Sequence, residues 1–369
     1  MKLRHLLLAA GLALPLMAAA QPQPELAQYQ GREKKKHADT NLVGKVLSAA
    51  EARQMTAQLR KMRDLMMAAP VIAGMRGYDW STYTSIKPAD EPGWPVIGRV
   101  GLIAFPYLKD HKTGQPVSSA EGPPFSIYVN DPSVLRLNTV YDVDEKARFM
   151  TEPRLTGRLD GYAVYENQFV VIARPGQILF APVTQERFLK RLIEKSRAEL
   201  KEMRGKLSSP ADDKAANERE IAGLSANVAR LRADAEKRWA TMGEKFAQRV
   251  AGERAKFDER EKQQLEQIEQ LKGSTPNQRF LAGFETKLKE LEQELRDLPA
   301  ADLNAPAYLP DGGKRVRASG LNAVNDANGR RVVTFHPQLF DAKKPKNAIQ
   351  LIVLGTPRYG MQLYQPLQQ

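Results

Sequence analysis

The fold is constrained most by residues 184–298, which have helical periodicity almost throughout and lie between segments with the alternation of β-strands. About a third of the chain is therefore predicted to form a helical arm. The strands that follow the arm are too few to bury a face alone, so we expect them to complete the sheet begun before it. The predicted fold class is α+β: a small antiparallel β-rich body with an N-terminal helix, interrupted by a long, coiled-coil-like arm of three helices.

Two capping signals divide the arm into helices. Ser209 is a favourable N-cap, and Pro210 after it suits the first helical position. Thr275 and Gln278 form a capping box around Pro276, directly after a glycine that suits a helix end. The predicted helices are residues 185–207, 210–272 and 276–298.

The apolar positions of the arm indicate how these helices pack. Both short helices keep the three-and-four spacing of a coiled-coil seam. The first carries Leu189, Ile193, Ser196, Leu200, Met203 and Leu207, and the third carries Leu281, Phe284, Leu288, Leu291, Leu295 and Leu298. The middle helix begins the same way and then changes to eleven-residue spacing, from Phe246 to Phe257 to Ile268. This spacing is typical of a straighter helix.

Two packings of the arm fit this pattern. In the first, the middle helix is unbroken, about 95 Å long at ~1.5 Å per residue, and each short helix folds back along one end of it. In the second, the middle helix breaks near Gly243, and the breaks near Ser209 and Ser274 lie level with each other. The complete capping signals, and an apolar period that continues through Gly243, favour the first packing. The candidate interaction face of the arm is Trp239, Met242, Phe246 and Val250.

The rest of the chain is predicted to form a polar leader and a body in two parts. Residues 21–43 are polar and lack an apolar period, which indicates a flexible leader. The body is expected over residues 44–183 and, after the arm, over residues 299–369. Its first helix follows a capping box at Ser48 and Glu51 and carries Met55, Leu59, Met62 and Met66. Its strands are predicted at residues 96–105, 125–129, 162–165, 169–173, 178–180, 332–335, 349–354 and 361–364.

The first residues of the chain indicate export. Lys2 and Arg4 precede an apolar run too short to span a bilayer, and Ala18, Ala19 and Ala20 follow it. This arrangement is typical of a secretory signal peptide over residues 1–20, cleaved near Ala20. We therefore expect a periplasmic or extracellular protein without a transmembrane segment in the mature chain. The chain has no Cys, so no disulfide supports its fold.

The net charge of +13 is not carried by the arm. Residues 184–298 contain 25 Lys and Arg against 22 Asp and Glu, mixed along the helices, which is typical of a solvated helical surface. The excess gathers in short basic clusters, such as residues 32–36 and 343–346. For an exported protein these clusters favour weak contact with acidic envelope polymers or lipid headgroups over nucleic acid, or they serve solubility alone.

The sequence contains few candidates for catalysis. Its four His have no metal-binding spacing, and it has no nucleophile elbow or phosphate-binding loop, so we predict neither a metal nor a cofactor. Asp142, Asp144 and Glu145 are close in sequence and could act as paired carboxylates, but a solvated turn or helix start is the favoured interpretation. Asn130 and Asp131 likewise indicate a turn.

Three functional hypotheses follow. The leading one is a non-enzymatic exported protein, an interaction or scaffold module whose arm contacts a protein partner or a second copy of the chain. The second is a periplasmic chaperone or assembly factor, which requires apolar surface on the arm beyond the seam. The third is a hydrolase with a site in the body, around Asp142, Asp144 or His336.

Overall fold

A computed structural model describes residues 24–44, 46–120, 122, 124–136, 140, 148–242, 247–311, 317–322 and 329–355. The chain divides into two compact units, each described here by itself. The sheet unit comprises Met1–Val140, Arg148–Val183 and Arg330–Gln369, and the arm unit comprises Tyr141–Ala147 and Thr184–Gly329. Both parts of the predicted body therefore contribute to one unit.

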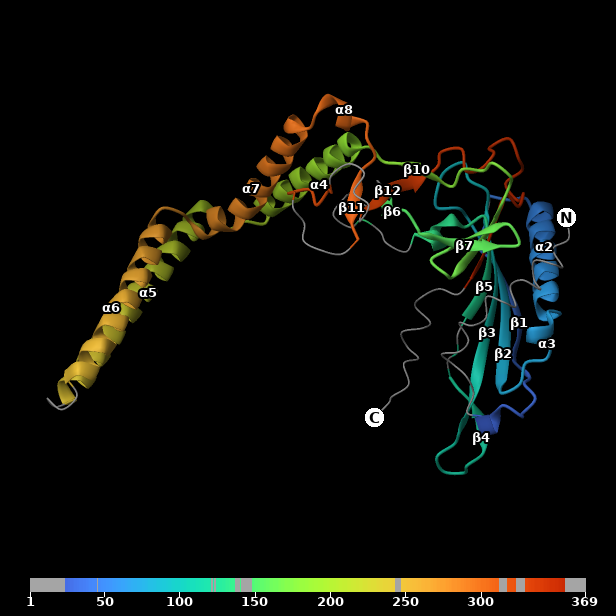
Figure 1. The fold of residues 1–369 in the computed structure, drawn as a ribbon, viewed down its shortest axis with the longest axis horizontal. Helices are drawn as coiled ribbons and strands as arrows, with labels where there is room; N and C mark the ends of the chain where they lie inside the picture. Colours follow the sequence, from blue (N-terminus) through green and yellow to red (C-terminus); the bar gives the residue numbers. More distant parts are fainter. Residues whose placement is uncertain are drawn as a thin grey trace. The chain divides into compact units, whose positions relative to one another are not determined.

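The sheet unit is built on a nine-stranded sheet in the order β1-β2-β3-β5-β13-β9-β8-β7, with β4 paired to β3 (Figure 1). The strands are β1 (Glu33–Asn41), β2 (Tyr78–Lys87), β3 (Ile97–Lys109), β4 (Pro116–Ser118), β5 (Pro124–Val129), β7 (Leu155–Leu159), β8 (Tyr162–Tyr165), β9 (Phe169–Ala173) and β13 (Leu351–Gly355). All of these pairings are antiparallel except the parallel pair of β1 and β2. The sheet is thus antiparallel, as predicted, but larger than expected.

The strands after the arm complete the sheet begun before it, which confirms the prediction. β13 lies between β5 and β9 and pairs with both. β12 (Gly329–Phe335) pairs with β10 (Phe180–Pro182) and β6 (Met150–Thr151) in a second, smaller sheet. The predicted strand at residues 361–364 lies outside the described residues.

One face of the large sheet is covered by α2 (Ala49–Met67), with the short α3 (Pro70–Ala73) after it (Figure 1). The capping box of Ser48 and Glu51 is present at the start of α2, as predicted. The predicted apolar positions face the sheet and are all buried, together with Ala52: Met55, Leu59, Met62 and Met66. They pack against alternate residues of the central strands, including Val100, Leu102, Ile127, Ile352 and Leu354.

The leader differs from the prediction of a flexible segment, because β1 and the short helix η2 (Pro24–Leu26) lie within residues 21–43. β1 is polar almost throughout and so lacks the alternation of apolar residues that indicates a strand. Its main chain pairs with β2, and its side chains are held by polar contacts instead of an apolar period. Lys34 Nζ, for example, donates to Ser119 O at 2.6 Å and lies 4.3 Å from the ring centroid of Phe105.

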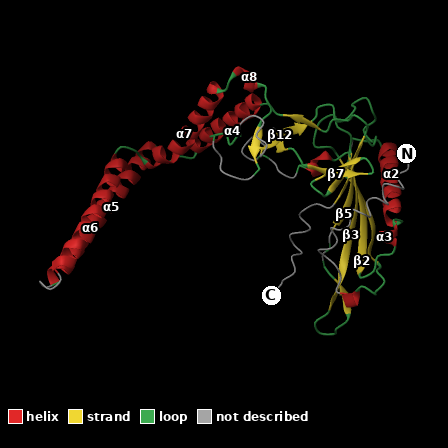
Figure 2. Cartoon of the chain, viewed as in Figure 1, coloured by secondary structure: helices red, strands yellow, loops and turns green. Residues whose placement is uncertain are grey.

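The arm unit contains two antiparallel helix pairs (Figures 1 and 2). α4 (Gln185–Gly205) lies along α7 (Pro276–Asp297), and α5 (Pro210–Thr241) lies along α6 (Ala247–Lys272). The predicted seam residues of both short helices are buried or partly buried. Short elements follow α7: α8 (Ala300–Leu303) and β11 (Tyr308–Pro310).

The preferred packing with one unbroken middle helix is wrong, and the second packing is the one observed. α5 ends at Thr241, and Met242 after it has an extended backbone, with φ −81° and ψ 101°. Asn277, after the second break, donates to Ser208 O beside the first at 3.1 Å, so the two breaks lie level. The physical reason is burial: folded back, α5 and α6 cover part of each other's seams along their length, whereas an unbroken helix would share them between two shorter partners.

Candidate functional site

The predicted interaction face is used partly inside the arm. Trp239 is only 7% exposed, and its ring meets Phe257 of α6 edge-on, with centroids 5.6 Å apart. The guanidinium of Arg254 lies 5.1 Å from the Trp239 ring centroid. Met242 and Val250 are partly buried, and Phe246 lies outside the described residues. The tryptophan therefore holds α5 and α6 together and is not a free surface.

The remaining apolar surface of the α5–α6 pair lies beside its seam. In α5, the buried apolar residues are Val228, Ala235 and Trp239. The other predicted apolar positions of α5, Ile221, Leu224 and Leu231, are only partly buried. In α6, Ile268 and Leu271 are buried, but Leu265 is 49% exposed. Two helices cannot cover a full apolar stripe on each other, so its edges stay in contact with water.

A polar cluster fixes the point where one helix pair passes into the other. Asn217 of α5 is buried; its Nδ2 donates to Leu271 O at 3.0 Å, and its Oδ1 accepts from Arg279 Nη1 at 3.0 Å. Buried Asp213 accepts from the backbone N–H of Asn277 at 3.0 Å. The capping signals predicted the breaks but not these contacts, which arise only when α5 and α6 are antiparallel.

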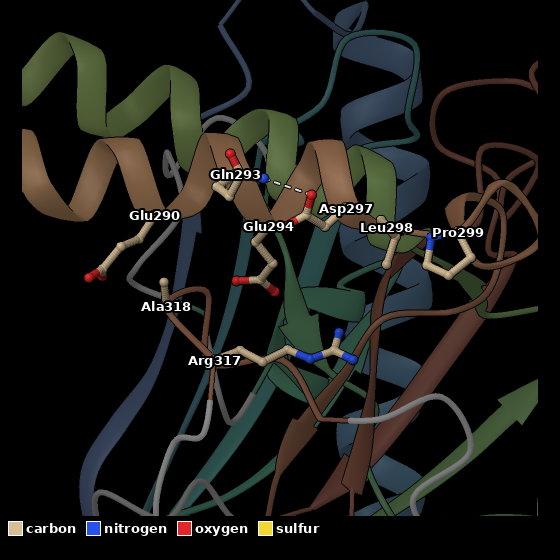
Figure 3. A pocket seen from close by; sticks show the side chains of 8 residues that line it. All are labelled: Glu290, Gln293, Glu294, Asp297, Leu298, Pro299, Arg317 and Ala318. Atoms are coloured by element: carbon tan, nitrogen blue, oxygen red, sulfur yellow. Dashed lines mark hydrogen bonds between the residues drawn. The ribbon is translucent and has the colours of Figure 1, made fainter.

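An open recess of about 600 Å³ lies beside the C-terminal half of α7, lined by Glu290, Gln293, Glu294, Asp297, Leu298, Pro299, Arg317 and Ala318 (Figure 3). Two of its carboxylates already have partners. Glu294 accepts from Ser319 N at 3.0 Å and from Ser319 Oγ at 2.6 Å, and Asp297 accepts from Gln293 Nε2 at 2.7 Å. These bonds hold the chain around Ser319 against α7, so we interpret the recess as structural.

The residues considered for hydrolysis are not brought together. Asp142, Asp144 and Glu145 lie outside the described residues. His336 follows β12 in a turn, where its Nδ1 accepts from Gln338 N at 3.1 Å. Asp131 accepts from Ser133 N and caps the short helix η3 (Pro132–Leu135), which is the turn predicted there.

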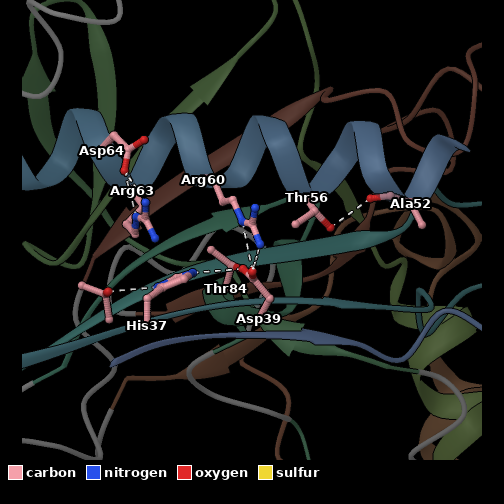
Figure 4. A network of polar contacts seen from close by, with 9 residues as sticks. His37, Asp39, Ala52, Thr56, Arg60, Arg63, Asp64 and Thr84 are labelled. Carbon is pink, nitrogen blue, oxygen red and sulfur yellow. Dashed lines mark hydrogen bonds and ion pairs between the residues drawn. The ribbon is translucent and has the colours of Figure 1, made fainter. Parts of the chain in front are cut away.

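A polar network that the sequence analysis did not find joins β1, β2 and α2 (Figure 4). Asp39 accepts hydrogen bonds from Arg60 of α2 and from Thr84 of β2, and it lies 3.0 Å from Nε2 of His37. The second ring nitrogen of His37, Nδ1, is 3.0 Å from Thr82 Oγ1. Because both nitrogens have protein partners, His37 has no free position for a substrate proton. The network contains a histidine and an aspartate, as a catalytic dyad does, but here it ties the edge strand β1 to β2 and α2.

This tie is expected to make stability depend on pH. The hydrogen bond from Arg60, helped by Thr84 and His37, holds the pKa of the Asp39 carboxyl well below its usual range. A lowered folded-state pKa stabilises the protein above the unfolded-state pKa of ~3.9, and this stabilisation is lost as the pH falls further. Asp39→Asn should therefore lower the urea midpoint at pH 7, and the difference from the unsubstituted chain should shrink at pH 3.

The matched control for this prediction is Asp64→Asn, which removes a carboxylate that is 64% exposed and bonded to its neighbour Arg63. It should change the midpoint little at either pH, because exposed ion pairs contribute little. A deficit of Asp39→Asn that is the same at pH 7 and pH 3 would show that the Asp39 charge is not what the tie needs.

Among the described residues, no group of three or more His, Asp or Glu side chains is placed to hold a metal ion. The same part of the chain contains no helix with the length and apolar character needed to cross a bilayer. Comparisons with protein-family models, with curated proteins and with solved structures found no match to this chain.

Proposed function

We propose that this chain is an exported, non-enzymatic binding protein that contacts a protein partner through a coiled-coil-like arm. The observation that carries the proposal is the incomplete apolar seam of the α5–α6 pair. Ile221, Leu224 and Leu231 are only partly covered, and Leu265 is 49% exposed. In α2, by contrast, every apolar position that the sequence predicted is buried against the sheet.

The contrast between the α5–α6 pair and α2 matters because the pair is long, so its uncovered seam is long as well. A helix in water gains most of its stability from burying an apolar face, and each helix here has one partner over most of its length. A further helix laid along the pair would cover the exposed edges of the seam, as in a helical bundle. The surface that supports the proposal is therefore apolar, and it runs along the two helices instead of enclosing a pocket.

The charged residues beside the seam suit such a role. Arg232 of α5 bonds to Asp258 and Glu261 of α6 at 2.5 Å and 2.8 Å, and Arg254 of α6 pairs with Glu236 of α5 at 3.1 Å. These exposed pairs add little stability, but they keep the arm soluble when it is free. They also favour a partner with complementary charge, which raises specificity more than affinity.

The other two hypotheses have weaker support. A chaperone that grips clients through Trp239 is not favoured, because Trp239 is buried between α5 and α6, and Phe280 of α7 is the aromatic residue of the arm that stays exposed among the described large apolar side chains, at 52%. A hydrolase is not favoured by His336, whose turn brings no carboxylate hydrogen bond to its ring among the described residues. Export is part of the proposal on the strength of the predicted signal peptide at residues 1–20.

The proposal can be tested by placing a photo-crosslinking amino acid at Leu265 in the tagged full-length chain, in the cells that produce it. We expect a discrete crosslinked product from Leu265. Leu155 of β7 is the matched control, because it is a comparably exposed leucine, at 55%, in the sheet unit. It should give no such product. The mass of the purified chain also reports whether residues 1–20 are removed.

The outcomes separate the possibilities. A product with the mass of two chains identifies a second copy as the partner, and any other discrete mass identifies a different protein. The binding proposal is wrong if Leu265 gives no product, or gives only the products that Leu155 gives.

A further inference from the structure

The face of the large sheet opposite α2 carries an arginine in an unusual setting. Side chains alternate between the two faces of a strand, so Arg99 and Gly101 of β3 lie opposite to Val100 and Leu102, which pack under α2. The strand register places Tyr128 of β5 beside Arg99, and both Tyr83 of β2 and Ser126 of β5 beside Gly101.

The guanidinium of Arg99 is held between two aromatic rings. Its central carbon lies 5.3 Å from the ring centroid of Tyr83 and 5.0 Å from that of Tyr128. Gly101 makes this possible: a Cβ there would lie 2.2 Å from atoms of the Tyr83 ring, so only glycine leaves room for it. Such stacking fixes the plane of the guanidinium and limits the water that reaches its faces.

The protein satisfies only part of the hydrogen-bonding capacity of Arg99. Nε and Nη2 donate to the hydroxyl of fully buried Ser126, at 3.2 Å and 3.0 Å. A guanidinium has five N–H donors, so these bonds leave three of them without an acceptor among the described residues. No carboxylate forms an ion pair with Arg99 among the described residues, whereas Arg330 and Arg331 of the same unit pair with Glu166 and Glu152.

A second polar group on this face lacks a partner. Ser81 lies two residues before Tyr83 on β2, and therefore on the same face. It is 8% exposed, and its Oγ has no hydrogen-bond partner in the part of the chain that the structure describes. A buried hydroxyl without a partner, or a partly buried cation with donors left over, is costly in a folded protein, and a bound ion is one explanation for such groups.

We propose that Arg99, with Tyr83, Tyr128 and Ser126, forms a binding site for a small oxyanion, a carboxylate or a phosphate group. The fork of a guanidinium matches two oxygens of either group, and charge-assisted bonds of this kind are strong where water is limited. The bond to Ser126 orients the guanidinium before the ligand arrives, which lowers the entropy lost on binding. This site is independent of the arm and of its proposed partner.

The test is an NMR titration of the full chain, following the side-chain Nε–H signal of Arg99. Inorganic phosphate and acetate are added in separate series, with the ionic strength held constant by sodium chloride. We expect a saturable shift of this signal with at least one anion, and the series that saturates identifies the group preferred. The signal is assigned by its loss in Arg99→Lys.

Arg99→Lys keeps the charge but not the fork, so calorimetry should show affinity for that anion reduced at least tenfold. Arg158→Lys is the matched control, because Arg158 of β7 is exposed and donates to Gly161 O; it should bind like the unsubstituted chain. Tyr83→Leu provides a second variant with Arg99 intact and should bind severalfold more weakly. A shift that is linear with both anions, or equal affinity in Arg99→Lys, overturns the proposal.

Discussion

Replacing Asn130 with alanine is expected to lower the free energy of unfolding of the sheet unit by about 4 kcal/mol, since each buried polar group left unpaired costs ~1–3 kcal/mol. Asn130 is completely buried. Its Nδ2 donates to Val96 O at 3.2 Å and to Ala348 O at 2.9 Å, and its Oδ1 accepts from the N–H groups of Gln350 and Leu351 at 2.8 Å and 3.2 Å. One side chain therefore joins the segment before β3 to the segment that enters β13.

The backbone of Asn130 explains part of this effect and supplies a control. Its φ of 56° is in the left-handed region, which asparagine tolerates better than alanine. Asn167 has nearly the same φ, 55°, but is exposed, and no hydrogen bond of its side chain is found among the described residues. Asn167→Ala should therefore lose only the backbone part, about 1 kcal/mol.

The measurement is urea unfolding followed by tryptophan fluorescence, in a chain that carries Trp239→Phe so that Trp80 and Trp94 both report on the sheet unit. Asn130→Gly removes the backbone strain of the positive φ but does not restore the side-chain hydrogen bonds. It should therefore recover about 1 kcal/mol of the free energy of unfolding that Asn130→Ala loses. If Asn130→Gly restores full stability, or if Asn130→Ala costs no more than Asn167→Ala, the four hydrogen bonds are not what holds these segments together.

Asn130 also shows what the sequence can and cannot predict here. Its composition and that of its neighbours predicted a turn, and a turn is found at η3. Local chemistry was likewise sufficient for the capping box of α2 and for the β8–β9 hairpin, where Glu166 and Asn167 have positive φ. The partners of Asn130, however, include residues more than two hundred positions away, and no local pattern contains them.

Two of the strands that the sequence did not predict have polar side chains where apolar ones are expected. β2 buries Asp79, Thr82 and Thr84, and β1 is almost entirely polar, so the alternation of apolar residues is weak in both. The continuity of the middle helix was predicted wrongly for a related reason. Its apolar period is the same whether the chain runs on or reverses, and only the pairing across the arm, such as that of Arg232 with Asp258, distinguishes them.

The candidate sites show the same contrast between local patterns, which the sequence reveals, and contacts between distant segments, which it does not. Periodicity placed Trp239 on an apolar face but gave no information on whether that face met another helix of the same arm. The setting of Arg99 had no sequence signal at all, because Tyr83, Ser126 and Tyr128 come from other strands and meet it through the register. Only the requirement for glycine at Gly101 is local, and it becomes interpretable once the ring above it is known.

Leu59→Ala should lower the free energy of unfolding of the sheet unit by about 3 kcal/mol, the usual range for a buried leucine being ~2–5 kcal/mol. Leu59 is fully buried in the face of α2 that packs on the sheet. The helix lies so close to β3 that a Cβ at Gly98 would be 2.9 Å from Leu59 Cδ2. Leu155→Ala, at an exposed leucine of the same unit, should change stability by less than ~0.5 kcal/mol.

The contact between Leu59 and Gly98 allows a sharper test than either single substitution. Gly98→Ala alone adds a methyl group 2.8 Å from Met55 Cε and 2.9 Å from Leu59 Cδ2, and we expect it to destabilise the unit by ~1–3 kcal/mol. In the double variant, the smaller side chain at position 59 makes room for that methyl group, so the combined loss should be at least ~0.5 kcal/mol smaller than the sum. Strict additivity would contradict the contact between Leu59 and Gly98 on which this prediction depends.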